Sequence, residues 1–196
     1  KHPKRNTMIM CHVDDPICQS KPSEHGSATT NMHWLHKELA SRFDMNGYKH
    51  LTVGVPIDFM STRLRLTAEG NLTIDNLAKI NKYLEELQML DCNPVKEPIR
   101  SDALKLLCSN PDTRGKMTED EKELCESQIG DLIWISQTTH PLLTLTTSVL
   151  ASIMKFKIEG TAKLIKHAWR WLQGTKDHAL VKYKGNKSGL GFSSDA

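Results

Sequence analysis

Two neighbouring carboxylates, Asp14 and Asp15, are the sharpest chemical feature of this 196-residue sequence. They follow a short apolar run at 7–13 that is typical of a buried strand, and 17–19 is a candidate returning strand of a hairpin. Adjacent carboxylates at such a turn present hard oxygen donors, which suit Mg²⁺ in phosphoryl or nucleotidyl transfer. Asp-Asp-Pro is also an ordinary turn sequence, so the spacing alone leaves both interpretations open.

A second candidate is the basic stretch 155–187, where nine bases stand against two acids. Trp169, Trp171 and Tyr183 are interleaved with these bases, a pattern that suits contact with a phosphate backbone. The alternative is a solvated helix face whose tryptophans lie in the core, and composition alone favours that alternative. The acidic stretch 117–131 has six acids against one base, and the capping box at Thr118 and Glu121 explains most of it as a helix start.

Composition excludes several other classes of protein. Hydrophobic residues make up 38% and charged residues 25%, which indicates a folded chain, and no apolar run is long enough for a membrane span. The five cysteines are an odd number with no C-x-x-C pair, which argues against a disulfide framework and favours a reducing compartment, cytoplasmic or nuclear. His33 and His36 lie three apart on a predicted helix but lack acidic or cysteine partners at a matching spacing, so a solvated role is favoured. The first residue is Lys1 and no secretory signal follows, so we expect a fragment of a longer protein.

The predicted elements give an α+β chain. We expect strands at 7–13, 17–19, 51–59, 63–67, 72–74, 179–184 and 190–193, and helices at 31–45, 75–90, 118–135, 141–157 and 161–173. Residues 91–116 carry three prolines and few apolar residues, which is typical of a linker and a domain boundary.

Several segments in this order resemble the reverse transcriptase region of copia-type long-terminal-repeat retrotransposons. The run ending in Asp14 and Asp15 resembles their Tyr-Val-Asp-Asp box. Further resemblances are 43–45 to Phe-x-Met, 53–57 to Leu-Gly-Ile-x-Ile, 128–135 to Ser-Leu-Ile-Gly-Ser-Leu-Leu-Tyr-Leu, 139–141 to Thr-Arg-Pro, 168–175 to Val-Leu-Arg-Tyr-Leu-Lys-Gly-Thr, and 191–196 to Gly-Tyr-Ser-Asp-Ala. Each motif is loose, and the match is specific because of their order and spacing from about residue 7 to residue 196.

The resemblance implies a partial palm of antiparallel hairpins with one packed helix at 1–90. A linker at 91–116, a mainly helical thumb and connection at 117–177 and the first strand of ribonuclease H at 178–196 would follow. Asp14 and Asp15 would bind the catalytic Mg²⁺ pair (Mn²⁺ is a possible substitute), and Asp195 would be the first ribonuclease H carboxylate. The template–primer, of RNA or DNA, would lie near His12, Lys163, Lys166, Arg170, Trp171 and Lys176. The other partner would be the remainder of a Pol polyprotein, with no role for a membrane.

The sequence also departs from the family pattern. His12 replaces the box tyrosine, Pro16 follows the box, and His140 and Leu142 replace Arg and Asp of Thr-Arg-Pro-Asp. The third palm aspartate and the fingers would lie before Lys1, so we expect the isolated chain to be inactive as an RNA-directed DNA polymerase. The rival hypothesis is a degenerate or co-opted module that binds nucleic acid, or serves as a scaffold, without catalysis.

Overall fold

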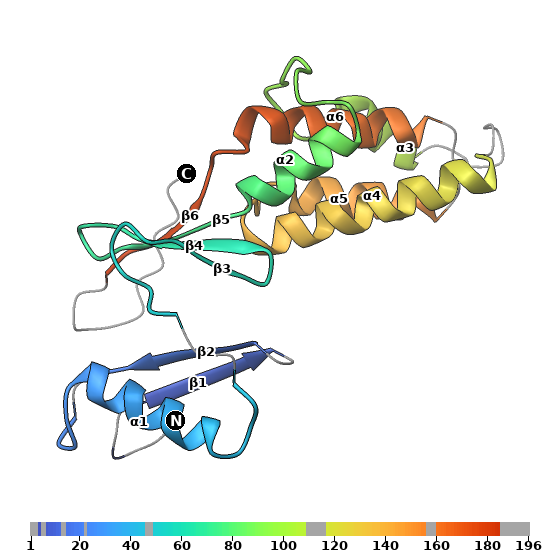
Figure 1. Ribbon diagram of the computed structural model, residues 1–196. Coiled ribbons are helices and arrows are strands. Elements are labelled where there is room, and N and C mark those ends of the chain that lie inside the picture. Colours follow the sequence, from blue (N-terminus) through green and yellow to red (C-terminus); the bar gives the residue numbers. More distant parts are fainter. Residues whose placement is uncertain are drawn as a thin grey trace. The chain divides into compact units, whose positions relative to one another are not determined.

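The computed structural model describes residues 4, 7–12, 15–21, 23–45, 49–108, 117–155 and 160–184, with backbone only at 10–12, 15, 16, 104 and 106–108. The chain forms two compact units, Lys1–Leu51 and Thr52–Ala196, which are described separately below. Both combine helices with antiparallel strands, so the predicted α+β class is confirmed (Figure 1).

The first unit holds a two-stranded hairpin and one helix. Strands β1 (Thr7–His12) and β2 (Asp15–Ser20) are antiparallel, and helix α1 spans Ala28–Ala40. The predicted helix at 31–45 is confirmed with shifted ends, because the Ser27 side chain caps α1 by accepting from the Thr30 amide. Asn31, expected near the cap, is instead buried in the first turn, where its Nδ2 donates to the Lys21 carbonyl at 3.1 Å.

A four-stranded antiparallel sheet begins the second unit. Its strands lie in the order β3 (Ile57–Phe59), β4 (Thr62–Leu66), β5 (Leu72–Asp75) and β6 (Leu180–Lys182). Met60 and Ser61 both have positive φ, 48° and 58°, so the β3–β4 connection is a tight two-residue hairpin turn. The predicted strand at 51–59 is shorter than expected because Pro56 has no N–H to donate to the ladder.

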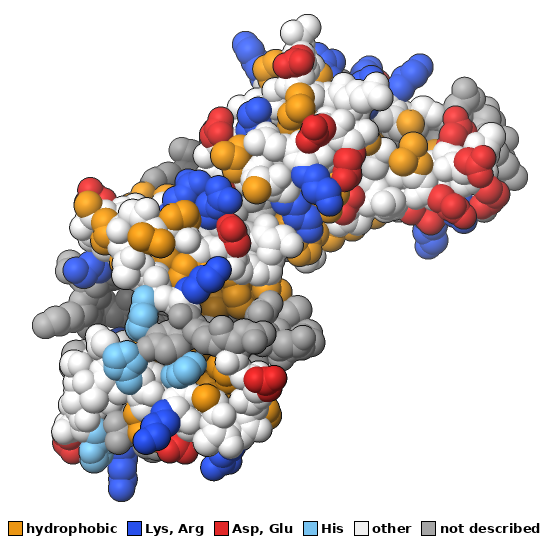
Figure 2. Space-filling model, in the orientation of Figure 1, with side chains coloured by type: hydrophobic (Ala, Val, Ile, Leu, Met, Phe, Trp, Pro, Cys, Tyr) orange, Lys and Arg blue, Asp and Glu red, His pale blue; other side chains and the backbone are white. Residues whose placement is uncertain are grey.

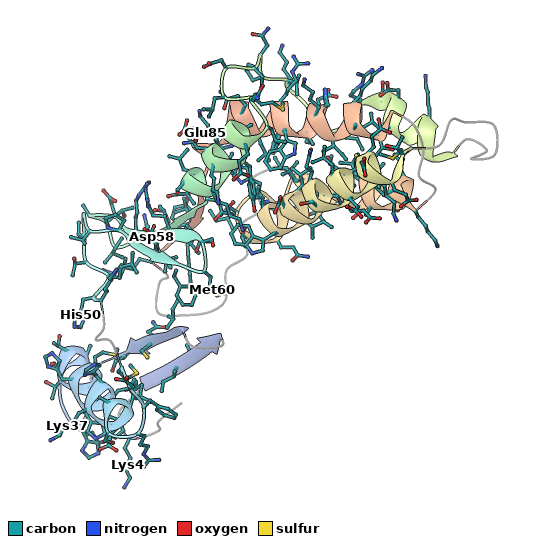
Figure 3. All side chains as sticks on the ribbon, turned by 45° about the vertical axis from the view of Figure 1, so that its right-hand side comes forward. Lys4, Lys37, His50, Asp58, Met60 and Glu85 are labelled. Atoms are coloured by element: carbon teal, nitrogen blue, oxygen red, sulfur yellow. The ribbon has the colours of Figure 1, made fainter. Side chains whose placement is uncertain are left out.

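In the described part of the second unit, five helices enclose its core. They are α2 (Leu77–Glu86), α3 (Ser101–Cys108), α4 (Glu119–Thr138), α5 (Leu143–Met154) and α6 (Thr161–Thr175). Their side chains fill the space between the helices (Figure 3), and fully buried members include Ile80, Leu132, Ile153, Ile165 and Trp169. The core therefore comes from the helices, with apolar faces at the spacing that the sequence predicted.

The acidic stretch opens α4 as predicted. Thr118 accepts from the Glu121 amide, and the Glu121 carboxylate accepts from the Thr118 amide at 3.0 Å, which completes the capping box. Acidic side chains gather at the N-terminal end of α4 (Figure 2). They face the positive end of the helix dipole, so this cluster has the structural role that the sequence indicated.

Two segments differ from the predicted domain organisation. Residues 91–116 contain helix α3, whose Ala103 is buried, and the segment runs within the second unit, whereas the units divide after Leu51. Strand β6 pairs with β5 of the earlier sheet, so 178–184 is not a separate segment. In the part of the chain that the structure describes, no helix is long and apolar enough to cross a membrane.

Candidate functional site

The β1–β2 hairpin carries the predicted carboxylate site. His12 pairs with Asp15, so the backbone register places Asp15 first in β2, at the end of the hairpin where β1 finishes. The returning strand starts two residues earlier than predicted, and Pro16 lies inside it opposite Cys11, as a two-stranded ribbon allows because each strand has a free edge. Asp14, Asp195 and the side chains of His12 and Asp15 lie outside the described residues.

Hard oxygen donors at this hairpin would suit Mg²⁺ or Mn²⁺. The backbone position of Asp15 is compatible with such a site, with Asp14 as the neighbouring donor. Among the residues whose side chains the structure describes, no group of three His, Cys, Asp or Glu could hold a metal ion. The magnesium site therefore stays a prediction about the hairpin end alone.

Helix α6 presents the exposed lysines of the predicted nucleic-acid surface. Lys163 and Lys166 are exposed, while Lys176 is half-buried at the C-cap. Spacing of three and seven residues places Lys163, Lys166 and Arg170 on one face of the helix. The two lysines can therefore face a phosphate backbone.

Arg170 has a structural partner that the sequence did not indicate. Its Nε donates to the Asn93 carbonyl at 2.7 Å, and one turn earlier His167 Nε2 bonds the Glu97 carbonyl at 2.9 Å. Gln173, on the same helix, makes a third such bond by donating to the Leu90 carbonyl. Burial is the main reason that the pKa of His167 is lowered, although the Glu97 carbonyl opposes this shift. The polar face of α6 therefore anchors the segment that we predicted as a linker.

The tryptophans of α6 lie in the core. Trp169 is fully buried and Trp171 is 5% exposed, with its ring in an edge contact with His140 at 6.0 Å between centroids. The prediction that Trp171 faces nucleic acid is corrected here, because its ring has no open face on which a base could stack. Tyr183, between Lys182 and Lys184 just after β6, is 66% exposed, so among the described aromatics of this stretch it is the one that solvent reaches.

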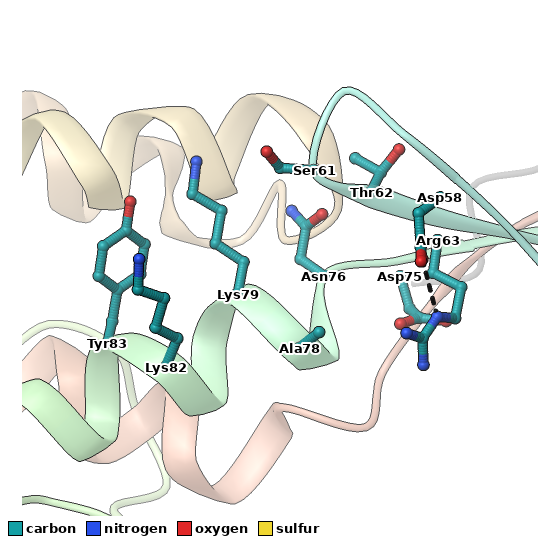
Figure 4. A pocket seen from close by; sticks show the side chains of 10 residues that line it. All are labelled: Asp58, Ser61, Thr62, Arg63, Asp75, Asn76, Ala78, Lys79, Lys82 and Tyr83. Carbon is teal, nitrogen blue, oxygen red and sulfur yellow. Dashed lines mark hydrogen bonds and ion pairs between the residues drawn. The ribbon is translucent and has the colours of Figure 1, made fainter. Parts of the chain in front are cut away.

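A pocket of about 320 Å³, lined mainly by residues with polar side chains, lies between the β3–β4 hairpin and the start of α2 (Figure 4). Its charges are largely paired: Arg63 Nε donates to Asp58 at 3.0 Å, and Arg65 lies 3.2 Å from the buried Asp75 carboxylate. Lys79 Nζ sits 3.6 Å from the centroid of the Trp134 ring. The two arginines therefore balance both pocket carboxylates, and the remaining charges are those of Lys79 and of Lys82, which lies 3.7 Å from Glu86.

His140 is a buried residue whose role the sequence did not reveal. It is 3% exposed, its Nδ1 lies 2.8 Å from the Thr139 hydroxyl, and its Nε2 lies 3.0 Å from the Thr175 carbonyl. Burial lowers the pKa of His140, the Thr175 carbonyl opposes that shift, and the neighbouring His178 adds to it. At the position of the arginine in the Thr-Arg-Pro motif that this sequence resembles, the chain therefore holds a buried imidazole with a lowered pKa, which joins the α4–α5 turn to the end of α6.

Comparison with known proteins gives relatives over nearly the whole chain. The sequence is 25% identical over 190 residues to the retrovirus-related Pol polyproteins from transposons RE1 and RE2 of Arabidopsis thaliana, covering 96% of this chain and 12% of each polyprotein. It is 24% identical over 181 residues to the uncharacterized mitochondrial protein AtMg00810 of the same plant, covering 91% of this chain and 66% of that protein.

This chain is similar to retrotransposon Pol polyproteins along almost its entire length. That similarity agrees with the resemblance drawn from the motifs, at the level of the polyprotein. No protein-family model and no solved structure matches the chain. The chain spans about an eighth of the length of the two polyproteins.

Proposed function

We propose that this chain is the part of a copia-type retrotransposon Pol polyprotein that carries the second half of the reverse transcriptase palm and the thumb and connection. The observation that carries the proposal is the similarity to Pol polyproteins over 96% of the chain. The hairpin supports it, because the motif aspartate Asp15 lies at the end of an antiparallel strand pair. The expected start of ribonuclease H at 178–196 rests on the motif at 191–196, which lies outside the described residues.

In this proposal the hairpin end supplies two of the carboxylates for nucleotidyl transfer. Asp14 and Asp15 would hold Mg²⁺, which activates the attacking hydroxyl and stabilises the leaving oxygens in two-metal chemistry. A chain that supplies two carboxylates, without a third carboxylate and without the fingers that hold the nucleotide, would not catalyse nucleotide addition. We therefore expect the isolated 196-residue chain to show no Mg²⁺-dependent primer extension, and measurable incorporation would contradict that expectation.

Metal binding tests the hairpin directly. Asp14→Asn combined with Asp15→Asn removes both charges and preserves side-chain size, so Mn²⁺ binding measured by calorimetry or by paramagnetic relaxation should disappear. Asp58→Asn is the matched control, because Asp58 is an exposed carboxylate in a different hairpin. Equal Mn²⁺ binding by the wild type and the double variant would show that the pair is an ordinary turn.

A second candidate function is nucleic-acid binding without catalysis, favoured by the exposed lysines of α6 and by Tyr183 between two lysines. Its signature is steep weakening of primer–template binding as salt rises. Replacing both Lys163 and Lys166 with Gln should reduce the slope of log affinity against log salt by about 1.8, because each phosphate that a lysine neutralises accounts for about 0.9. Lys105→Gln, an exposed lysine on α3, is the control. Binding that is absent or independent of salt would exclude this function.

A further inference from the structure

A buried chain of hydrogen bonds joins four elements of the second unit. Asn76, at the start of α2, donates through Nδ2 to the hydroxyls of Thr138 at 2.6 Å and Thr139 at 3.0 Å. The chain continues through the bond of Thr139 to His140 Nδ1 and the bond of His140 Nε2 to the Thr175 carbonyl. It therefore connects α2, α4, the α4–α5 turn and the end of α6.

The partners of His140 define which ring nitrogen carries its proton. A carbonyl only accepts, so Nε2 must donate to Thr175, and in the neutral ring Nδ1 then accepts from the Thr139 hydroxyl. A second proton on Nδ1 would place two donors against each other, unless the Thr139 hydroxyl turned to another acceptor. Thr139 Oγ1 also accepts from Asn76, so a turn of the Thr139 hydroxyl would alter its bond to Asn76 as well as its bond to His140.

His178 lies against the same ring from the segment that follows α6. The two imidazoles are stacked, with centroids 6.5 Å apart and planes inclined by 8°, and His178 is exposed to solvent. The His178 amide donates to the Thr175 carbonyl at 2.9 Å, so the carbonyl that holds His140 also anchors this segment. Two residues later the chain enters β6, which pairs with β5.

The surroundings of His140 leave His178 as its charged neighbour. In the described part of the chain, His140 faces Thr139 from α4, Trp171 and the Thr175 carbonyl from α6, and His178 from the following segment. Burial is the main cause that lowers the pKa of His140, and of these groups His178 is the one that lowers it further through charge. Protonation of His140 would therefore place a positive charge in a buried site beside His178.

We propose that His140 and His178 form an acid-sensitive latch that holds 175–178, the segment leading into β6, against the α4–α5 turn at neutral pH and releases this segment on acidification. At neutral pH the His140 ring is uncharged, it stacks on His178, and the hydrogen-bond chain is complete. On acidification a second proton on His140 turns Nδ1 from an acceptor into a donor, and it puts a positive charge in a buried site where His178 opposes it. The segment then separates from His140, and β6, the edge strand that it leads into, becomes less stable. This inference does not depend on the proposed function.

Hydrogen exchange of the full chain, corrected at each pH for the intrinsic exchange rate, tests the latch. Between about pH 7.5 and about pH 5, the range in which histidines titrate, amide protection over 176–182 should fall about tenfold more than protection in α5. In the double variant His140→Gln with His178→Gln, the extra loss should vanish. Glutamine can donate to the Thr175 carbonyl and accept from Thr139 without titrating.

His167→Gln is the matched control, because it removes another histidine with a lowered pKa from α6 without touching the latch. It should respond to pH as the wild type does. If the double variant fails to fold, His178→Gln alone, at an exposed position, should reduce the extra loss of protection by removing the repulsion. An unchanged response in the variants, or wild-type protection over 176–182 that follows α5 at every pH, would overturn the proposal.

Discussion

At the scale of single residues, burial decides which members of the basic stretch can meet a ligand. Lys163 and Lys166 are exposed, whereas the ring of Trp171 is packed in the core against His140. All three lie on one helix, yet they face opposite environments because successive residues of a helix point about 100° apart. A tryptophan beside an arginine is therefore weak evidence for base stacking until its exposure is known.

Replacing Trp171 tests this assignment. Trp171→Ala should lower the free energy of unfolding by about 3–5 kcal/mol, the usual cost of truncating a buried aromatic side chain. Trp171→Phe keeps a buried ring and should cost less. The measurement is the denaturant midpoint of each variant, with Tyr183→Ala as an exposed aromatic control that should stay close to wild type. An unfolding free energy for Trp171→Ala equal to that of wild type would show that the ring is not part of the core.

At the scale of elements, local sequence signals set the ends of the helices. The capping box at Thr118 and Glu121 begins α4, and Ser27 begins α1. Interactions between residues distant in sequence then determine which groups contact each face of a helix. The polar side of α6 is occupied in part by carbonyls of Leu90, Asn93 and Glu97. A helix face that is basic in sequence thus serves both as an anchor and as a solvated surface.

Removing the cap of α4 should have a defined cost. Thr118→Ala leaves the Glu121 amide without its side-chain acceptor and should destabilise the fold by about 1 kcal/mol. Thr118→Ser retains the hydroxyl and should restore nearly all of that loss. Chemical denaturation followed by helical circular dichroism measures both variants. Equal stability of the alanine and serine variants would contradict the role of this hydroxyl.

At the scale of the whole molecule, the two units differ in how much apolar surface they bury. The core cluster lies entirely in the second unit, from Ile80 to Leu172. Among the described residues of the first unit, Leu35 is the apolar side chain that is buried. Because apolar burial is the main favourable term in folding, the first unit should be the less stable of the two.

Hydrogen exchange of the full chain should reveal this difference. Amides of α4, α5 and α6 are expected to exchange only through global opening, while those of β1, β2 and α1 exchange through openings of lower free energy. Leu35→Ala should accelerate exchange in the first unit without changing α5, whereas Leu150→Ala, at a buried position of α5, should accelerate exchange in the helices of the second unit. Equal protection of β1 and α5 would contradict the expected difference in stability.

Local patterns in the sequence are enough to predict the α+β class, the positions of most helices and strands, the capping box of α4 and the resemblance to Pol polyproteins. These features follow from periodicity, caps and turn residues, which act within a few positions along the chain. The three-dimensional fold was needed to learn that β6 pairs with β5, that 91–100 lies along α6, and that Trp171 and His140 meet in the core. These interactions join residues far apart in the chain, and they depend on how the apolar faces pack together, which local patterns do not specify.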